Sequence, residues 1–344
     1  MRYPEFLPQG GTIGFIAPSF GCATEPYKTA FENAQYKLQE MGYRLALGPN
    51  CYADKGIGIS NTPGECGREV MEMFLSGKAD CVISCGGGEL MCEILPYVDF
   101  ERLAAAKPTW FMGYSDNTNL TFLLPTLADT VAVYGPCAGA FGMEPWHESL
   151  RDAFGILTGR QLTVKGYEAW EKESLKGPEN PLASYNLTEK RVIRSYLGRR
   201  PVSAKQRFRG RLLGGCMDCL VNLCGTRFDK TGEFAERYKE DGIIWFFESC
   251  ELNVFAIRRA MWQMEQAGWF RHVKGFLIGR PQNGEPLMGL DRYEAVLETA
   301  GRLNVPVVMD VDLGHLPPMM PLVTGSMADV TVQENDIAIA MDFR

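Results

Sequence analysis

Short apolar runs alternate with amphipathic stretches through residues 1–160. Each run is four to six residues long and is bounded by glycine, proline or polar residues, as expected of buried parallel strands. The stretch 25–41 is typical of a helix, and another helix is expected to begin at Thr62-Pro-Gly-Glu65, which has capping-box spacing. The alternation predicts a mostly parallel α/β sheet covered on both faces. Its strands are expected at 12–17, 79–84, 109–113 and 131–134.

The pattern changes after residue 160. Residues 161–208 are polar with few periodic apolar positions, and we interpret them as a linker or substrate loop. From Arg209 the regularity returns and predicts a smaller domain of mixed α and β structure over 209–344. The predicted elements there are a helix at 212–224, strands at 243–247, 273–278 and 305–311, helices at 253–267 and 291–303, and a hairpin from 329–332 and 337–341.

Composition narrows the functional classes. The chain has 344 residues, more than a single core usually holds, and a 46% hydrophobic content suited to two cores. Its net charge of −7 argues against nucleic acid or an anionic membrane as the principal partner. The N-terminus has no apolar export signal, and no apolar run approaches the roughly 18 residues of a membrane span. We therefore expect a cytoplasmic protein.

The cysteines do not predict a metal site. There are eleven, an odd number, and in a cytoplasmic protein they are expected to be reduced. The tightest group is Cys216-Met-Asp-Cys219, but no second close pair stands at a suitable spacing and no His-Glu-x-x-His occurs. We expect these residues to pack as small side chains.

A candidate nucleophile stands at the end of a predicted strand. The sequence Gly113-Tyr-Ser115 leads into a stretch that looks helical, as in a nucleophile elbow, although the second glycine of that motif is missing. Serine is also a common helix N-cap, so a structural role for Ser115 stays open. Gly86-Gly-Gly88 ends a neighbouring strand, where backbone amides can approach a ligand closely. Asp116 is expected to cap its own helix.

A serine nucleophile needs a base and an acid that orients the base. Of three histidines, His315 follows a strand and precedes two prolines, which makes it the best candidate base. Glu248 ends an apolar strand and is a candidate acid. Asp310 and Asp312 compete with it because they lie close to His315 in the sequence.

The succession of these motifs resembles the LD-carboxypeptidase family of serine peptidases. The motifs are Gly86-Gly-Gly88, Gly113-Tyr-Ser-Asp116, Phe246-Phe-Glu248 and Gly314-His315, and the resemblance covers essentially the whole chain. It implies a flavodoxin-like N-terminal domain joined to a smaller C-terminal domain, in a homodimer. The family includes cytosolic murein tetrapeptide carboxypeptidases and microcin C self-immunity peptidases.

The resemblance also implies roles for individual residues. Ser115 is the expected nucleophile, His315 its base, and Glu248 the acid that orients the base in preference to the two aspartates. The backbone amides of Gly88 and Asp116 are the expected oxyanion hole. No metal or organic cofactor is expected.

The substrate is expected to be a small peptide or an aminoacyl-nucleotide. Murein-recycling members usually carry Gly-Gly-Tyr-Gly where this chain has Gly86-Gly-Gly-Glu89, and the long loop with Trp170 looks more like the immunity branch. In that branch a loop tryptophan stacks on the nucleotide base, whereas Trp170 can equally pack its loop onto the protein. Gly87 and Arg280 are further candidates for substrate contact, Arg280 through a substrate carboxylate. A surface ion pair is the simpler role for Arg280.

Two rival interpretations come from other classes. A non-catalytic flavodoxin-like module would bind phosphate at Gly86-Gly-Gly88, but the Gly-x-Gly-x-x-Gly and Gly-x-x-x-x-Gly-Lys-Ser/Thr spacings are missing. A cysteine hydrolase using Cys85 or Cys250 leaves Ser115 unexplained. We therefore favour the serine hydrolase.

Overall fold

The computed structural model describes residues 1–343 and divides into two compact units. Unit 1 holds residues 1–162 and 173–186, and unit 2 holds residues 163–172 and the chain from Leu187 onward. The stretch 161–208, predicted as a linker or loop, is thus divided between the units. It contains the short strands β6 (Thr163–Lys165), β7 (Ala169–Glu171), β8 (Leu187–Lys190), β9 (Arg194–Leu197) and β10 (Arg200–Pro201).

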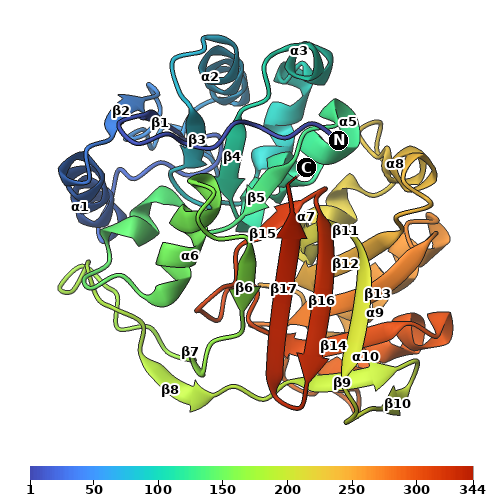
Figure 1. Ribbon diagram of the computed structural model, residues 1–344. Helices are drawn as coiled ribbons and strands as arrows, with labels where there is room; N and C mark the ends of the chain where they lie inside the picture. Colours follow the sequence, from blue (N-terminus) through green and yellow to red (C-terminus); the bar gives the residue numbers. More distant parts are fainter. Residues whose placement is uncertain (344) are drawn as a thin grey trace. The chain divides into compact units, whose positions relative to one another are not determined.

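The strands of unit 1 form a parallel sheet in the order β2-β1-β3-β4-β5 (Figure 1). This is the strand order of flavodoxin-like folds, which bind ligands beyond the carboxyl ends of their strands. Every residue of β3, β4 and β5 is buried, as the continuous apolar runs predicted. The predicted fold class is therefore confirmed. The strands are β1 (Thr12–Ile16), β2 (Arg44–Leu47), β3 (Cys81–Ser84), β4 (Trp110–Gly113) and β5 (Ala132–Tyr134).

Helix α2 of unit 1 begins where the capping-box signal places it. The hydroxyl oxygen of Thr62 accepts a hydrogen bond from the N–H of Glu65 at 3.4 Å, with Pro63 at the first helical position.

In residues 1–343 no helix is both long enough and apolar enough to cross a membrane. The helices of unit 1 are α1 (Tyr27–Glu40), α2 (Pro63–Leu75), α3 (Phe100–Ala105), α4 (Thr118–Thr121), α5 (Leu123–Ala128) and α6 (Glu148–Leu157), with the 3-10 helices η1 (Met91–Tyr97), η2 (Ser115–Asn117) and η3 (Ala138–Gly142).

Unit 2 is built on a mixed sheet in the order β10-β9-β14-β13-β12-β11-β16-β17-β6 (Figure 1). The central strands β11 to β14 are parallel to one another, and the flanking strands are antiparallel. Strands β7 and β8 pair separately. The further strands are β11 (Gln206–Cys216), β12 (Ile243–Glu248), β13 (Val273–Gly279), β14 (Pro306–Val311), β15 (Leu322–Thr324), β16 (Met327–Gln333) and β17 (Asp336–Asp342).

The prediction of a helix from residue 212 was wrong for its first five residues. Residues 212–216 belong to β11 and pair with β12, and helix α7 covers only Met217–Leu223. Gly214 and Gly215 have φ values of 153° and 146°, and a Cβ on Gly214 would lie 1.8 Å from the carbonyl oxygen of Phe246. Gly214 therefore allows a close strand pairing that no other residue type permits.

Stacked aromatic rings fill the core of unit 2. The ring of Trp245 lies 5.5 Å from that of Trp269 and 5.4 Å from that of Phe247, and all three side chains are fully buried. The helices of this unit are α7, α8 (Thr231–Arg237), α9 (Val254–Gln266) and α10 (Arg292–Ala300), with the 3-10 helix η4 (Gly301–Leu303).

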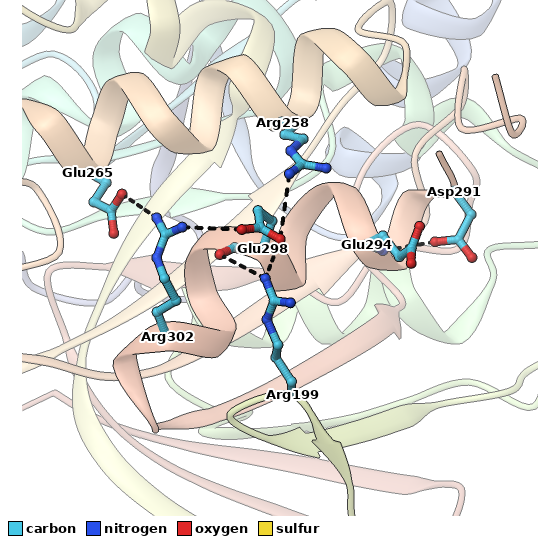
Figure 2. Close-up of polar contacts among 7 residues, drawn as sticks. All are labelled: Arg199, Arg258, Glu265, Asp291, Glu294, Glu298 and Arg302. Carbon is cyan, nitrogen blue, oxygen red and sulfur yellow. Dashed lines mark hydrogen bonds and ion pairs between the residues drawn. The ribbon is translucent and has the colours of Figure 1, made fainter. Parts of the chain in front are cut away.

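An ion-pair network lies on the surface beside α9 and α10. The Glu298 carboxylate pairs with Arg199, with Arg258 at 3.5 Å and with Arg302 at 3.4 Å, and Arg302 also contacts Glu265 at 2.7 Å (Figure 2). These side chains are partly exposed, so the network joins the β9–β10 hairpin to two helices without a large stabilising effect.

Candidate active site

Ser115 lies at a strained turn between β4 and η2. Its φ of 62° is in the left-handed region, which a non-glycine residue rarely adopts. Its N–H donates to the hydroxyl oxygen of Tyr134 at 3.2 Å, and its side chain is half-buried. This is the sharp strand-to-helix turn that the sequence predicted, and a nucleophile elbow places its serine on a strained turn of the same kind.

The glycine turn 86–88 packs directly against this serine. A Cβ on Gly87 would lie 3.1 Å from the Cβ and 3.2 Å from the Oγ of Ser115. Asn117 joins the two segments, because its side-chain amide donates to the carbonyl oxygens of Gly86 at 2.7 Å and Tyr114 at 3.1 Å. Within residues 1–343 the N–H of Gly88 donates no hydrogen bond. An amide in this state is available to a ligand.

Asp116 is not a cap for the following helix. Its buried carboxylate accepts from the Ser19 hydroxyl at 2.6 Å and from the N–H of Met91 at 2.9 Å, so it holds the loops after β1 and β3 beside the serine turn. Burial raises the pKa of Asp116 to about 6, against the effect of these two hydrogen bonds.

Glu248 and His315 form a buried pair in unit 2. Glu248 is the last residue of β12 and is 1% exposed, and its Oε2 lies 2.8 Å from Nδ1 of His315. A carboxylate only accepts, so Nδ1 carries a proton, and in the neutral imidazole Nε2 has the lone pair. Gly314, at φ 97°, makes the approach possible, since a Cβ there would lie 2.5 Å from Oε2 of Glu248.

The surroundings of His315 raise the pKa of its imidazole. Burial lowers the pKa of the imidazole, but the Glu248 carboxylate and the Cys250 thiol raise it by more, to about 11. Because this pKa is higher in the folded chain than in the unfolded one, the pair stabilises the fold fully below about pH 6.5. That stabilisation is lost as the pH rises through the folded-state pKa.

Asp218 supports the pair and was missed in the sequence. Its carboxylate accepts from the N–H groups of Cys250 at 3.0 Å, Glu251 at 2.9 Å and Leu252 at 3.1 Å, which fixes the loop that follows Glu248. The only signal was its position inside Cys216-Met-Asp-Cys219, which we considered for metal binding. Within residues 1–343 no group of three His, Cys, Asp or Glu side chains is arranged to hold a metal ion.

Asp310 and Asp312 have other partners in this unit. Asp310 accepts from the hydroxyl of Tyr293 at 2.7 Å, and Asp312 pairs with Arg280 at 2.7 Å.

Arg280 and Trp170 contact each other. Arg280 is 3% exposed, and its guanidinium lies 4.9 Å from the centre of the Trp170 ring and donates to the carbonyl oxygens of Asp310 at 3.0 Å and Leu316 at 3.4 Å. Of its nitrogens only Nε has no partner within residues 1–343. Arg280 therefore braces the His315 loop from both sides, and a direct contact with substrate stays a prediction.

Two sequence-family models match the chain. The LD-carboxypeptidase N-terminal domain matches residues 13–135, and the LD-carboxypeptidase C-terminal domain matches residues 209–330. Together they cover more than half of the chain. The chain belongs to the LD-carboxypeptidase family.

Individual relatives agree with this membership. The microcin C7 self-immunity protein MccF of Escherichia coli is 25% identical over 98% of this chain and 95% of its own length. The murein tetrapeptide carboxypeptidase of Pseudomonas aeruginosa is 23% identical over 90% of this chain and 89% of its own. A structure of MccF with aspartyl sulfamoyl adenosine has a TM-score of 0.79 at 24% identity, covering 100% of this chain and 99% of that one. The structural likeness establishes a shared fold.

The raised pKa of His315 depends on the carboxylate beside it. In Glu248→Gln the attraction is lost and burial remains, so the imidazole pKa is expected to fall toward or below the ordinary value of about 6.5. NMR titration of the imidazole nitrogens measures this, and with three histidines in the chain the signals are readily assigned. An unchanged pKa in Glu248→Gln would contradict the pairing.

The contact between Glu248 and the Gly314 backbone leaves no room for a side chain at position 314. Gly314→Ala forces a left-handed alanine against Glu248 and is expected to cost more than about 1 kcal/mol in the free energy of unfolding. The pKa of His315 should fall with it. Gly232→Ala is the matched control, because a Cβ there meets nothing within 4 Å and the position is helical. Equal stability and equal His315 titration in both variants would refute the close contact.

Proposed function

We propose that the protein is a serine carboxypeptidase-type hydrolase with Ser115 as nucleophile, His315 as general base and Glu248 as the group that orients the base. The buried Glu248–His315 pair carries this proposal, since the 2.8 Å contact holds a proton on Nδ1, so that Nε2 of the neutral imidazole can accept a proton. The left-handed backbone at Ser115 supports its role, because strain of this kind is concentrated at functional sites.

The reaction follows from these roles. Nε2 of His315 takes the hydroxyl proton as Oγ of Ser115 attacks the carbonyl carbon of an amide near a free carboxyl terminus or in an aminoacyl-nucleotide. The negative charge on the carbonyl oxygen is stabilised by the amides of Gly88 and Asp116, and each such donor is typically worth about 3 kcal/mol. His315 then protonates the leaving nitrogen, and the acyl–serine ester forms.

Water completes the cycle. His315 takes a proton from water, the hydroxide attacks the ester carbonyl, and the proton returns to Oγ of Ser115 as the acid product leaves. These steps need no metal or organic cofactor. Because the pKa of His315 is raised, the neutral base becomes more abundant as the pH rises, so kcat/KM is expected to increase toward alkaline pH.

We favour an aminoacyl-nucleotide substrate, as in the microcin-immunity branch. The similarity to MccF extends over 98% of the chain, and a structure of MccF holds aspartyl sulfamoyl adenosine. Trp170 supports this choice, because it presents a half-buried indole on β7 with Arg280 against its ring. The second candidate is a murein tetrapeptide, supported by the similarity to the murein tetrapeptide carboxypeptidase.

The first test measures hydrolysis of both candidate substrates by the wild-type protein and by variants of the three proposed catalytic residues. The wild-type protein, incubated with aspartyl sulfamoyl adenosine and with a murein tetrapeptide, should release aspartate from the first, detected by mass spectrometry. Ser115→Ala should lower kcat by about 10⁶ with the fold intact, as in subtilisin-type triads. Glu248→Gln should cost less than His315→Ala, because the acid orients the base and does not react. More than a few per cent of wild-type activity in Ser115→Ala would overturn the nucleophile role.

The second test separates the two substrates. An aromatic platform contributes about 1–3 kcal/mol to a stacked base, so Trp170→Ala should raise KM for aspartyl sulfamoyl adenosine roughly ten- to a hundredfold. A tetrapeptide has no base and should be nearly unaffected. Trp262→Ala serves as control, since Trp262 is 59% exposed on α9. If Trp170→Ala impairs both substrates alike, the indole supports only its own loop.

A further inference from the structure

Lys176 carries a half-buried charge that nothing in unit 1 neutralises. It lies in the segment 173–186, and its ammonium stands 5.6 Å from the centre of the Tyr27 ring. Burial lowers the pKa of Lys176, and no described carboxylate lies within ion-pair distance of its ammonium. Lysine side chains are seldom withdrawn from water unless they are paired, because an unpaired charge loses hydration without compensation.

The segment around Lys176 does not need this charge to keep its shape. Gly177 and Asn180 exchange backbone hydrogen bonds of 3.4 and 2.9 Å in a tight turn. The Ser184 hydroxyl donates to the carbonyl oxygen of Glu144 at 2.9 Å, and the Asn186 side chain donates to that of Glu173 at 3.0 Å. A structural reason for the lysine is therefore missing from its own segment.

Residues 20–22, near Lys176, contact the glycine turn that packs against Ser115. The thiol of Cys22 donates to the carbonyl oxygen of Cys85 at 3.6 Å, immediately before Gly86. The N–H of Phe20 donates to the carbonyl oxygen of Gly87 at 2.8 Å. Phe20 and Tyr27 are 43% and 57% exposed, so two apolar rings and one cation border the carboxyl edge of the sheet. Such a border suits a ligand with an acidic group.

We propose that Lys176 is a specificity residue that binds a carboxylate of the substrate through its unpaired ammonium. This inference deepens the proposed function and rests on it. A substrate carboxylate would form the ion pair that the Lys176 ammonium lacks in the folded chain. The Tyr27 ring beside the ammonium limits the positions that the ammonium can take. Arg280 has its carboxylate in Asp312, whereas Lys176 has none within the described residues.

Binding to the Ser115→Ala protein tests the proposal without requiring turnover. Calorimetry measures Kd for two pairs of probes: aspartyl against asparaginyl sulfamoyl adenosine, and a murein tetrapeptide against its C-terminal amide. Adding Lys176→Met should weaken binding of an acid probe about ten- to a hundredfold, the size of a charge-assisted hydrogen bond, and leave its amide partner unchanged. The pair that responds identifies which carboxylate is bound.

Two controls separate recognition from folding. Lys28→Met removes an exposed lysine next to Tyr27 and should leave all four Kd values unchanged. The Tm of Lys176→Met should be equal to or above that of the parent, because an unpaired, half-buried charge is removed. The proposal is overturned if Lys176→Met alters acid and amide probes equally, alters neither, or if no probe binds. Failure of the wild-type protein to hydrolyse the acids, with their binding still dependent on Lys176, would refute only the proposed function.

Discussion

The pairing of a buried carboxylate with a buried imidazole is the constraint on which unit 2 depends. Glu248 ends a strand in which every residue is buried, so its charge is costly without a partner. His315 supplies that partner at 2.8 Å, and glycines at 279 and 314 leave room for the contact. The pair in turn requires a loop held by Asp218 on one side and a loop braced by Arg280 on the other.

In unit 1 the backbone is strained at Ser115. Ser115 has a left-handed φ, while Gly87 and Asn117 pack so closely around it that the turn has little freedom to relax. Asp116 adds a buried carboxylate that ties two further loops to the same turn. Such a network holds the Ser115 side chain and the neighbouring backbone amides in fixed positions, and the proposed catalysis by preorganised groups requires this.

The sequence predicted the strands that end before Ser115, at Glu248 and before His315, because continuous buried apolar runs have an unambiguous pattern. It also predicted the parallel sheet and the helix start at Thr62. It did not predict that Gly214 and Gly215 lie in a strand, since only the neighbouring Phe246 carbonyl explains their conformation. The short strands of 161–208 were missed because edge strands such as β8 are largely exposed and carry no apolar alternation.

Long-range polar contacts were the least predictable part of the site. Asp218 meets N–H groups 32 to 34 residues away, and Arg280 meets Asp312 only after two strands have been placed side by side. Local patterns do not encode such partners. The family resemblance, in contrast, selected Glu248 over the two aspartates, and Oε2 of Glu248 lies 2.8 Å from Nδ1 of His315.

Labelling with a fluorophosphonate tests the central claim most directly. The reagent traps a serine only when a base activates it, and peptide mapping by mass spectrometry identifies the modified residue. The account predicts a single adduct on Ser115 in the wild-type protein and a rate of labelling lower by orders of magnitude in His315→Ala. No adduct on Ser115, or equal labelling rates in the two proteins, would contradict it.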